Sequence, residues 1–165
     1  MSFVQTIAAA AKPWADFYSH SKTTSSIVTW VHLAGILVGG GFALASDRAA
    51  LRAIGADLDE RTRVLRDFGT IHRPVLLALV VVVLSGILQT LSDAETFLVS
   101  KVYWTKMALV VLLLANGYNV MRTEQRLSLD PGSANKLWGR FRFGALASMT
   151  LWLATLLAGT FLLSA

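Results

Sequence analysis

The chain has 165 residues, of which 55% are apolar and 15% charged, and it carries a net charge of +5 and no cysteine. An average soluble domain has about 25% charged residues, so this composition argues against a soluble globule. The lack of cysteine excludes disulfide scaffolds, thiolate zinc sites and cysteine nucleophiles. A basic excess in so apolar a chain is more typical of membrane-flanking loops than of nucleic-acid binding. The composition therefore indicates an integral membrane protein, surrounded by the lipid bilayer and without a nucleic-acid partner.

The N-terminal segment, residues 1–24, has the pattern of a short amphipathic helix. Its apolar side chains recur at helical spacing, and Gln5, Lys12 and Asp16 take the opposite face. It lacks the basic start and the long apolar run of a signal peptide. We expect this helix either to lie in the interface on the outer side of the membrane or to pack as an arm against the other helices or a partner.

Four apolar stretches follow, each close to the ~20 residues that cross a hydrocarbon layer as a helix. They cover residues 26–45, 74–91, 102–121 and 143–163. Peptide groups in hydrocarbon must be hydrogen-bonded within the protein, so each stretch is predicted to be helical. The predicted fold class is therefore all-α: a polytopic membrane protein with a four-helix transmembrane bundle and a short N-terminal interfacial helix, forming a single domain over residues 1–165.

The basic residues are distributed unevenly between these stretches. Of the 15 lysines and arginines, 11 lie in the two segments that follow the first and third stretches. The positive-inside rule predicts that both segments are cytoplasmic, which leaves both termini outside. Within the first segment, residues 47–66 are expected to form a helix that leads into the second stretch. In the second segment, Asp130-Pro131-Gly132-Ser133 is a turn signal.

Two polar side chains near the start of apolar stretches are candidate functional residues, because ionisable groups are costly at membrane depth. These are His32 in the first stretch and Lys106 in the third. The two stretches run in the same direction, so the two side chains are predicted to face each other at the same depth, near the outer side. Lys106 has an alternative, which is to extend its amine to the outer interface.

Two glycines share a helical face with His32 and suggest how a ligand could bind. Gly35 and Gly39 leave a flat groove in which a porphyrin could lie while the imidazole ligates the iron. The other interpretation is a Gly-x-x-x-Gly helix contact, with His32 hydrogen-bonded to a neighbouring helix. His72 is expected at the inner surface, where it begins a helix and lies too far in depth from His32 to share one haem.

Further polar residues in the third stretch favour a structural role. Asn116, Tyr118 and Asn119 are expected to hydrogen-bond between helices. No Walker loop, zinc-binding His-Glu-x-x-His motif or nucleophile elbow is found in the sequence. Whether the protein is an enzyme is therefore left open by its motifs.

Three short motifs resemble those of a group of bacterial membrane proteins. They are Trp30-x-His32-Leu33 followed by glycines, Ser85-Gly86, and Tyr103-Trp104-x-Lys106. Together they resemble the membrane domain of the copper resistance protein D (CopD) family, and the first and third are similar to those of HemJ-type protoporphyrinogen oxidases. The resemblance implies a bacterial cytoplasmic membrane and either copper handling or a b-type haem with an oxidase activity. The residues that carry over are His32 and Lys106.

Two functional interpretations remain open from the sequence. In the first, the protein handles copper or haem b at a cofactor site formed by His32, Gly35, Gly39 and Lys106, with His32 as the metal ligand. In the second, it is a non-catalytic accessory or structural subunit that packs against a membrane-protein partner or further copies of itself. A transporter is less expected, because the second and fourth stretches have almost no polar side chains to line a pathway.

Overall fold

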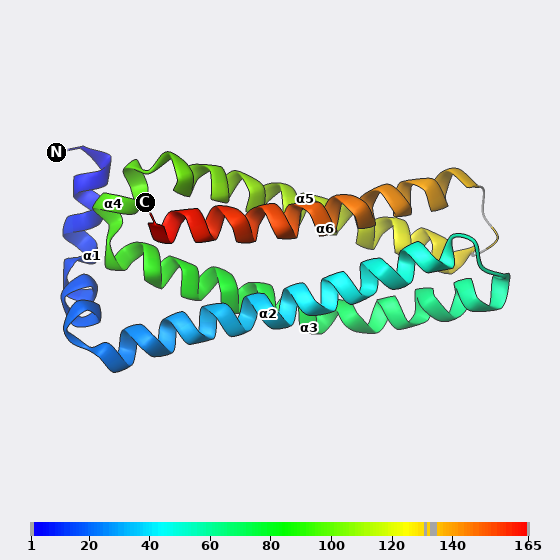
Figure 1. The fold of residues 1–165 in the computed structure, drawn as a ribbon, viewed down its shortest axis with the longest axis horizontal. Helices are drawn as coiled ribbons and strands as arrows, with labels where there is room; N and C mark the ends of the chain where they lie inside the picture. The colour runs from blue at the N-terminus through cyan, green and yellow to red at the C-terminus, as the bar shows by residue number, and fades with distance from the viewer. Residues whose placement is uncertain (1, 131, 133–134, 165) are drawn as a thin grey trace.

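The computed structural model describes residues 2–130, 132 and 135–164, although not the side chains of His72, Asn135, Leu163 and Ser164. All regular elements in the described part are helices (Figure 1), which confirms the all-α prediction. They are α1 (Phe3–His20), α2 (Lys22–Ala53), α3 (Leu58–Ser92), α4 (Ala94–Val99), α5 (Lys101–Leu129) and α6 (Asn135–Ser164).

The N-terminal helix α1 lies across one end of the four long helices (Figure 1). It begins with a capping box, in which Ser2 accepts from the Gln5 amide and the Gln5 side chain accepts from the Ser2 amide. It packs against α3 and α4, and the indole of Trp14 donates a 2.8 Å hydrogen bond to the Leu88 carbonyl. The segment is therefore an arm held against the other helices, and Phe3 remains exposed on it.

The four long helices lie side by side as two hairpins. α2 packs mainly against α3, and α5 mainly against α6, while α6 also contacts α2. Both chain ends lie at the end that holds α1 and α4, and the turns after α2 and α5 lie at the other end (Figure 1). The four long helices thus run alternately up and down, and the two basic segments lie together at the turn end (Figure 1). This agrees with the prediction that both segments are on the same side of the membrane.

Helices α2 and α3 are longer than the apolar stretches that predicted them. They have 32 and 35 residues, whereas about 20 residues suffice to cross the hydrocarbon. The basic segment between them is not a separate loop. It consists of the last turns of α2, a short turn closed by the N-cap Asp57, and the first turns of α3. The single helix expected over residues 47–66 is therefore not found: residues 47–53 end α2, and residues 58–66 begin α3, which continues into the apolar part.

Three of the four long helices are long and apolar enough to cross a membrane. These are α2, α3 and residues Lys136–Leu162 of α6, judged by length and composition over the described residues. α5 is of similar length, but Lys106, Asn116 and Asn119 interrupt its apolar run. The structure therefore supports three of the four expected membrane-spanning helices.

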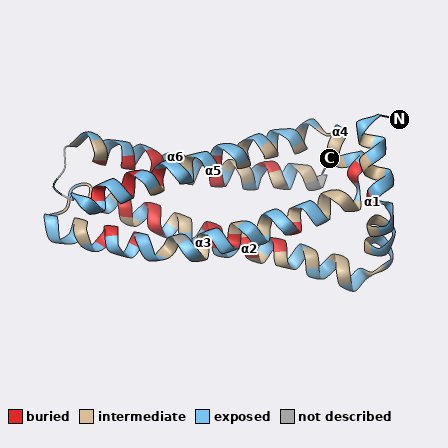
Figure 2. Cartoon of the chain, turned by 180° about the vertical axis from the view of Figure 1, so that it is seen from behind, coloured by how far each residue is buried: buried red, intermediate tan, exposed pale blue. Residues whose placement is uncertain are grey.

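The best-buried core lies at the turn end, as Figure 2 shows by the concentration of buried residues there. Trp138 and Phe141 of α6 are almost fully buried and pack edge to face. The Arg61 guanidinium covers the Trp138 ring at 4.9 Å and donates a 2.7 Å hydrogen bond to the Ile54 carbonyl. All four long helices contribute apolar side chains to this core, so it joins the two hairpins.

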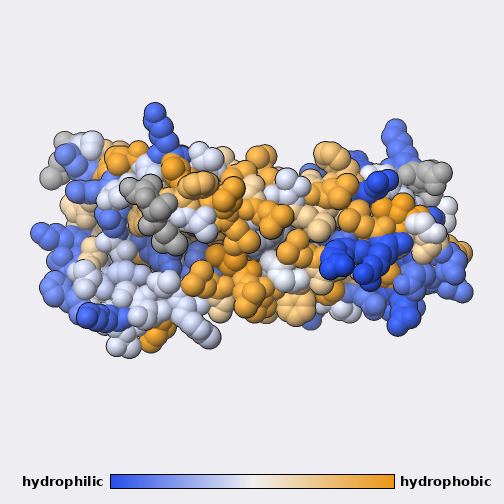
Figure 3. Space-filling view, in the orientation of Figure 1, coloured by the Kyte–Doolittle hydropathy of each residue, from blue (hydrophilic) through white to orange (hydrophobic). Residues whose placement is uncertain are grey.

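The middle of the molecule exposes apolar side chains instead of burying them. Figure 3 shows a hydrophobic band across the centre of the visible face, with hydrophilic residues gathered towards both ends. Large exposed side chains in this region include Leu37, Leu77, Val111 and Leu153. So extensive an apolar surface exceeds what a soluble monomer normally shows and suits contact with lipid or with other membrane helices.

Candidate functional site at His32

His32 lies between α2 and α3, where its ring contacts the Ser85 hydroxyl and the backbone of Val82. Its side chain is only 7% exposed. Its Nδ1 atom is 2.9 Å from the hydroxyl oxygen of Ser85 on α3. The neighbouring Gly86 makes room for the ring, since a Cβ there would stand 3.3 Å from His32 Cε1. The Ser85-Gly86 pair thus both anchors and accommodates the imidazole.

The hydrogen bonds of Ser85 determine which ring nitrogen of His32 carries the proton. The Ser85 hydroxyl donates to the Val81 carbonyl at 2.6 Å, which uses its only proton. Its oxygen must then accept from His32, so Nδ1 is the protonated nitrogen. The other nitrogen, Nε2, keeps its lone pair and is able to ligate a metal. A histidine ligand is commonly oriented in this way, through a hydrogen bond from its other nitrogen.

Lys106 points into the molecule rather than out to the interface. Its Cε and Nζ atoms both lie 3.8 Å from the Cβ position of Gly159 on α6. The charge of its amine is also close enough to act on the His32 ring. Lys106 thus lies on the inner face of α5 beside α6, and its charge reaches the His32 ring on α2.

The stripe formed by His32, Gly35 and Gly39 faces the interior, and all three residues are buried. The space beside the glycines is filled by α3. A Cβ on Gly35 would lie 2.8 Å from Val82 Cγ2, and one on Gly39 would lie 3.1 Å from Ala78 Cβ. Both glycines thus serve as close helix contacts, and a porphyrin does not fit against them while α2 and α3 are packed in this way.

The remaining polar candidates are placed as follows. Asn116 donates a 2.9 Å hydrogen bond to the Gly144 carbonyl, which is the predicted link between α5 and α6. Tyr118 is half exposed and lies under the Arg122 guanidinium, so it has no such linking role. The side chain of His72 lies outside the described residues. No group of three or more His, Asp or Glu side chains gathers in the described part of the chain.

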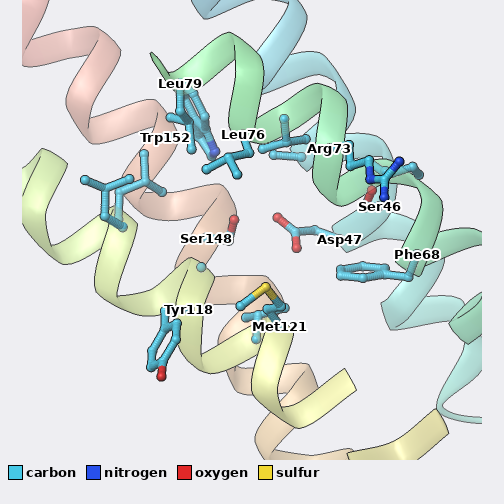
Figure 4. Close-up of a pocket in the computed structure, with 17 residues that line it drawn as sticks. Ser46, Asp47, Phe68, Arg73, Leu76, Leu79, Tyr118, Met121, Ser148 and Trp152 are labelled. Atoms are coloured by element: carbon cyan, nitrogen blue, oxygen red, sulfur yellow. The ribbon is translucent and has the colours of Figure 1, made fainter. Parts of the chain in front are cut away.

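One buried carboxyl, Asp47, was not anticipated from the sequence. It stood among the charges of the first basic segment, yet it is 3% exposed and lines a cavity together with Ser148 and Trp152 of α6 (Figure 4). Its position held a signal, because Gly40 and Ala43 precede it by seven and four residues on the same face of α2. An acidic residue that continues a stripe of small residues is a candidate for burial.

No family model matches this chain, and no curated protein or solved structure is found to be similar to it. The interpretation of the site therefore depends on its geometry. That geometry is an imidazole protonated on Nδ1, an inward-facing lysine whose charge reaches the ring, and glycine contacts that hold α2 against α3.

Proposed function

We propose that the chain is an integral membrane protein whose four long helices form a transmembrane bundle. The three apolar helices and the exposed apolar band support this, and α5 would cross with Lys106 and Asn116 turned towards α6. Both termini would lie outside and the two basic ends in the cytoplasm, because 11 of the 15 basic residues occur there. The CopD- and HemJ-like motifs would place it in a bacterial cytoplasmic membrane.

We further propose that this protein handles a metal ion or haem iron through His32 Nε2. The observation that carries the proposal is the hydrogen bond from Nδ1 to Ser85, since a proton on Nδ1 leaves the lone pair of Nε2 for a ligand. Lys106 would place a positive charge beside the bound group and favour an anionic co-ligand or a haem propionate. Since α3 fills the space beside Gly35 and Gly39, a metal ion such as copper suits this geometry better than a porphyrin lying on the glycine stripe.

The second candidate is an accessory subunit of a larger membrane complex. The observation that favours it is the extent of exposed apolar side chains on α3 and α6, among them Leu76, Leu77, Leu84, Leu153 and Leu157. A partner's helices could cover this surface as well as lipid does.

Purification in detergent, followed by an absorption spectrum and metal analysis, distinguishes the two candidates. The ligand proposal predicts a Soret band or about one metal ion per chain. The His32→Gln variant should lose it. The matched control is His20→Gln, because His20 is exposed on α1 and bonded through Nδ1 to the Asp16 carbonyl. A colourless, metal-free protein that purifies with other membrane proteins would support the accessory role and contradict the ligand site.

A further inference from the structure

A second site lies at the turn side of the molecule, away from His32. It is a cavity of about 340 Å³ between the two hairpins, lined by residues of α2, α3, α5 and α6 (Figure 4). Most of its wall is apolar. The polar groups that line it are Ser46, Asp47, Arg73, Tyr118 and Ser148.

The Asp47 carboxyl in this cavity lacks a partner for one of its oxygens. Its side chain is buried and points into the cavity towards Ser148, whose hydroxyl is hydrogen-bonded to it (Figure 4). The second oxygen, Oδ2, is buried and has no hydrogen-bond partner within the described part of the chain. A buried charge is costly unless it is paired and hydrogen-bonded. The cavity therefore suits a ligand that brings a cationic hydrogen-bond donor to Oδ2.

An arginine provides the opposite charge in the same cavity. Arg73 lines it from α3, and its side chain is exposed. A guanidinium is well suited to phosphate, which it binds with two parallel hydrogen bonds. The cavity thus presents one group for a cation and one for a phosphate.

The positions of these charges along the helices match the edge of the apolar region. Asp47 comes just after the apolar stretch of α2, and Arg73 comes just before the apolar stretch of α3. The cavity continues from them along Leu76 and Leu79 of α3 and Leu113 of α5, into the apolar part. Leu76 is 63% exposed, so the wall opens to the outside on the α3 side.

We propose that this cavity binds the head group of a phospholipid that carries both a primary ammonium and a phosphate. The ammonium donates to Asp47, the phosphate accepts from Arg73, and the acyl chains run along the leucines into the bilayer. Both polar groups of such a lipid have a partner at the edge of the apolar region, in Asp47 and Arg73, and its hydrocarbon has the apolar wall that begins at Leu76. A trimethylammonium head has no N–H group and cannot satisfy Oδ2.

The test measures lipid retention by native mass spectrometry of the purified chain in detergent. The protein is mixed with equal amounts of dioleoyl phosphatidylethanolamine and dioleoyl phosphatidylcholine, which differ only in the methylation of the amine. We expect the ethanolamine lipid to be retained about tenfold more than the choline lipid, the ratio expected from one charge-assisted hydrogen bond. Equal retention of the two lipids would overturn the proposal.

Substitutions assign the preference to the cavity. Asp47→Asn removes the charge with little change in shape and should abolish the preference. Asp67→Asn is its matched control, because Asp67 is an exposed residue of α3, also on the turn side of the molecule, and does not line the cavity. A preference that survives in Asp47→Asn, or that is lost equally in both variants, would contradict the assignment.

A second pair of variants keeps the test decisive if Asp47→Asn does not fold. Gly117 lines the cavity, and a Cβ there meets nothing within 4 Å, so Gly117→Leu should begin without a clash and fill part of the cavity. It should lower retention of the ethanolamine lipid, whereas Gly41→Leu, at an equally open position outside the cavity, should not. Arg73→Gln should weaken retention of both lipids, because both carry the phosphate. Stronger retention in Arg73→Gln would show that Arg73 competes for Asp47, and the proposed phosphate contact would be wrong.

Discussion

Replacing Gly35 with alanine is expected to destabilise the folded chain, because no space remains there for a Cβ. The added atom would lie 2.8 Å from Cγ2 of Val82 and 3.4 Å from the carbonyl oxygen of Ala78. Valine in a helix has one strongly preferred rotamer, so Val82 cannot easily turn away. The contact with Ala78 involves backbone, which cannot move without its helix. α2 and α3 must therefore separate locally to admit the methyl group.

A neighbouring glycine allows the size of this effect to be isolated. Gly41 lies on the same helix, and a Cβ there meets nothing within 4 Å. Both substitutions gain the same helix propensity, about 1 kcal/mol in a helix interior. Only Gly35→Ala adds an overpacked contact, which costs about 1–3 kcal/mol in a close-packed interior. The two variants should therefore differ by about 1–3 kcal/mol in free energy of unfolding, with Gly35→Ala the less stable.

The assay is reversible unfolding in mixed micelles, followed by circular dichroism. Equal stability of the two variants would refute the packing of α2 on α3 at Gly35. A second readout concerns the His32 site, which lies one helical turn away. Separation of α2 from α3 should lengthen the contact between His32 and Ser85 and reduce any bound metal or haem in Gly35→Ala, but not in Gly41→Ala.

The remaining predictions concern the imidazole, the topology and the N-terminal arm. Ser85→Ala removes the acceptor for the His32 N–H and should destabilise the fold by about 1–3 kcal/mol. It should also weaken metal binding by about 10–100-fold in a titration, whereas unchanged affinity would show that Ser85 does not orient the ring. Single cysteines at Asp130 and Glu95 should be labelled from the cytoplasmic and the outer side respectively, and the reverse pattern would overturn the orientation. Trp14→Phe removes the hydrogen bond to Leu88 and should speed amide exchange in α1 with little change elsewhere; exchange that stays slow would show that this bond does not hold the arm.

The local sequence determined where the helices form and how deep their polar residues lie. Apolar runs of membrane-spanning length predict helices, and Ser21, Asp57 and Ser100 begin helices by accepting hydrogen bonds from their own first turns. Depth follows from the constant rise per residue of a helix. Counting residues therefore predicted one level for His32 and Lys106, and in the structure the Lys106 charge acts on the His32 ring.

The continuation of α2 and α3 beyond their apolar stretches was only partly visible. Hydropathy marks the segment that suits the bilayer, but a helix continues wherever its backbone remains hydrogen-bonded and its sides are packed. At the turn end, Ala50, Leu65, Phe68, Trp138 and Phe141 form the core that extends both hairpins past the apolar stretches. That core combines residues far apart in the chain, so no local pattern revealed it.

Only the tertiary structure decided which helix each face meets. Gly35 and Gly39 were compatible with a haem groove or with a helix contact, and the approach of α3 selects the contact. The sequence allowed Lys106 to extend outward to the interface. In the structure its side chain lies inward, beside Gly159 of α6. The burial of Asp47 depends on Ser148 and Trp152 of α6, which line the same cavity and come from a distant part of the chain. The regular geometry of a helix determines which of its residues share a face. The surfaces against which that face packs come from distant parts of the chain.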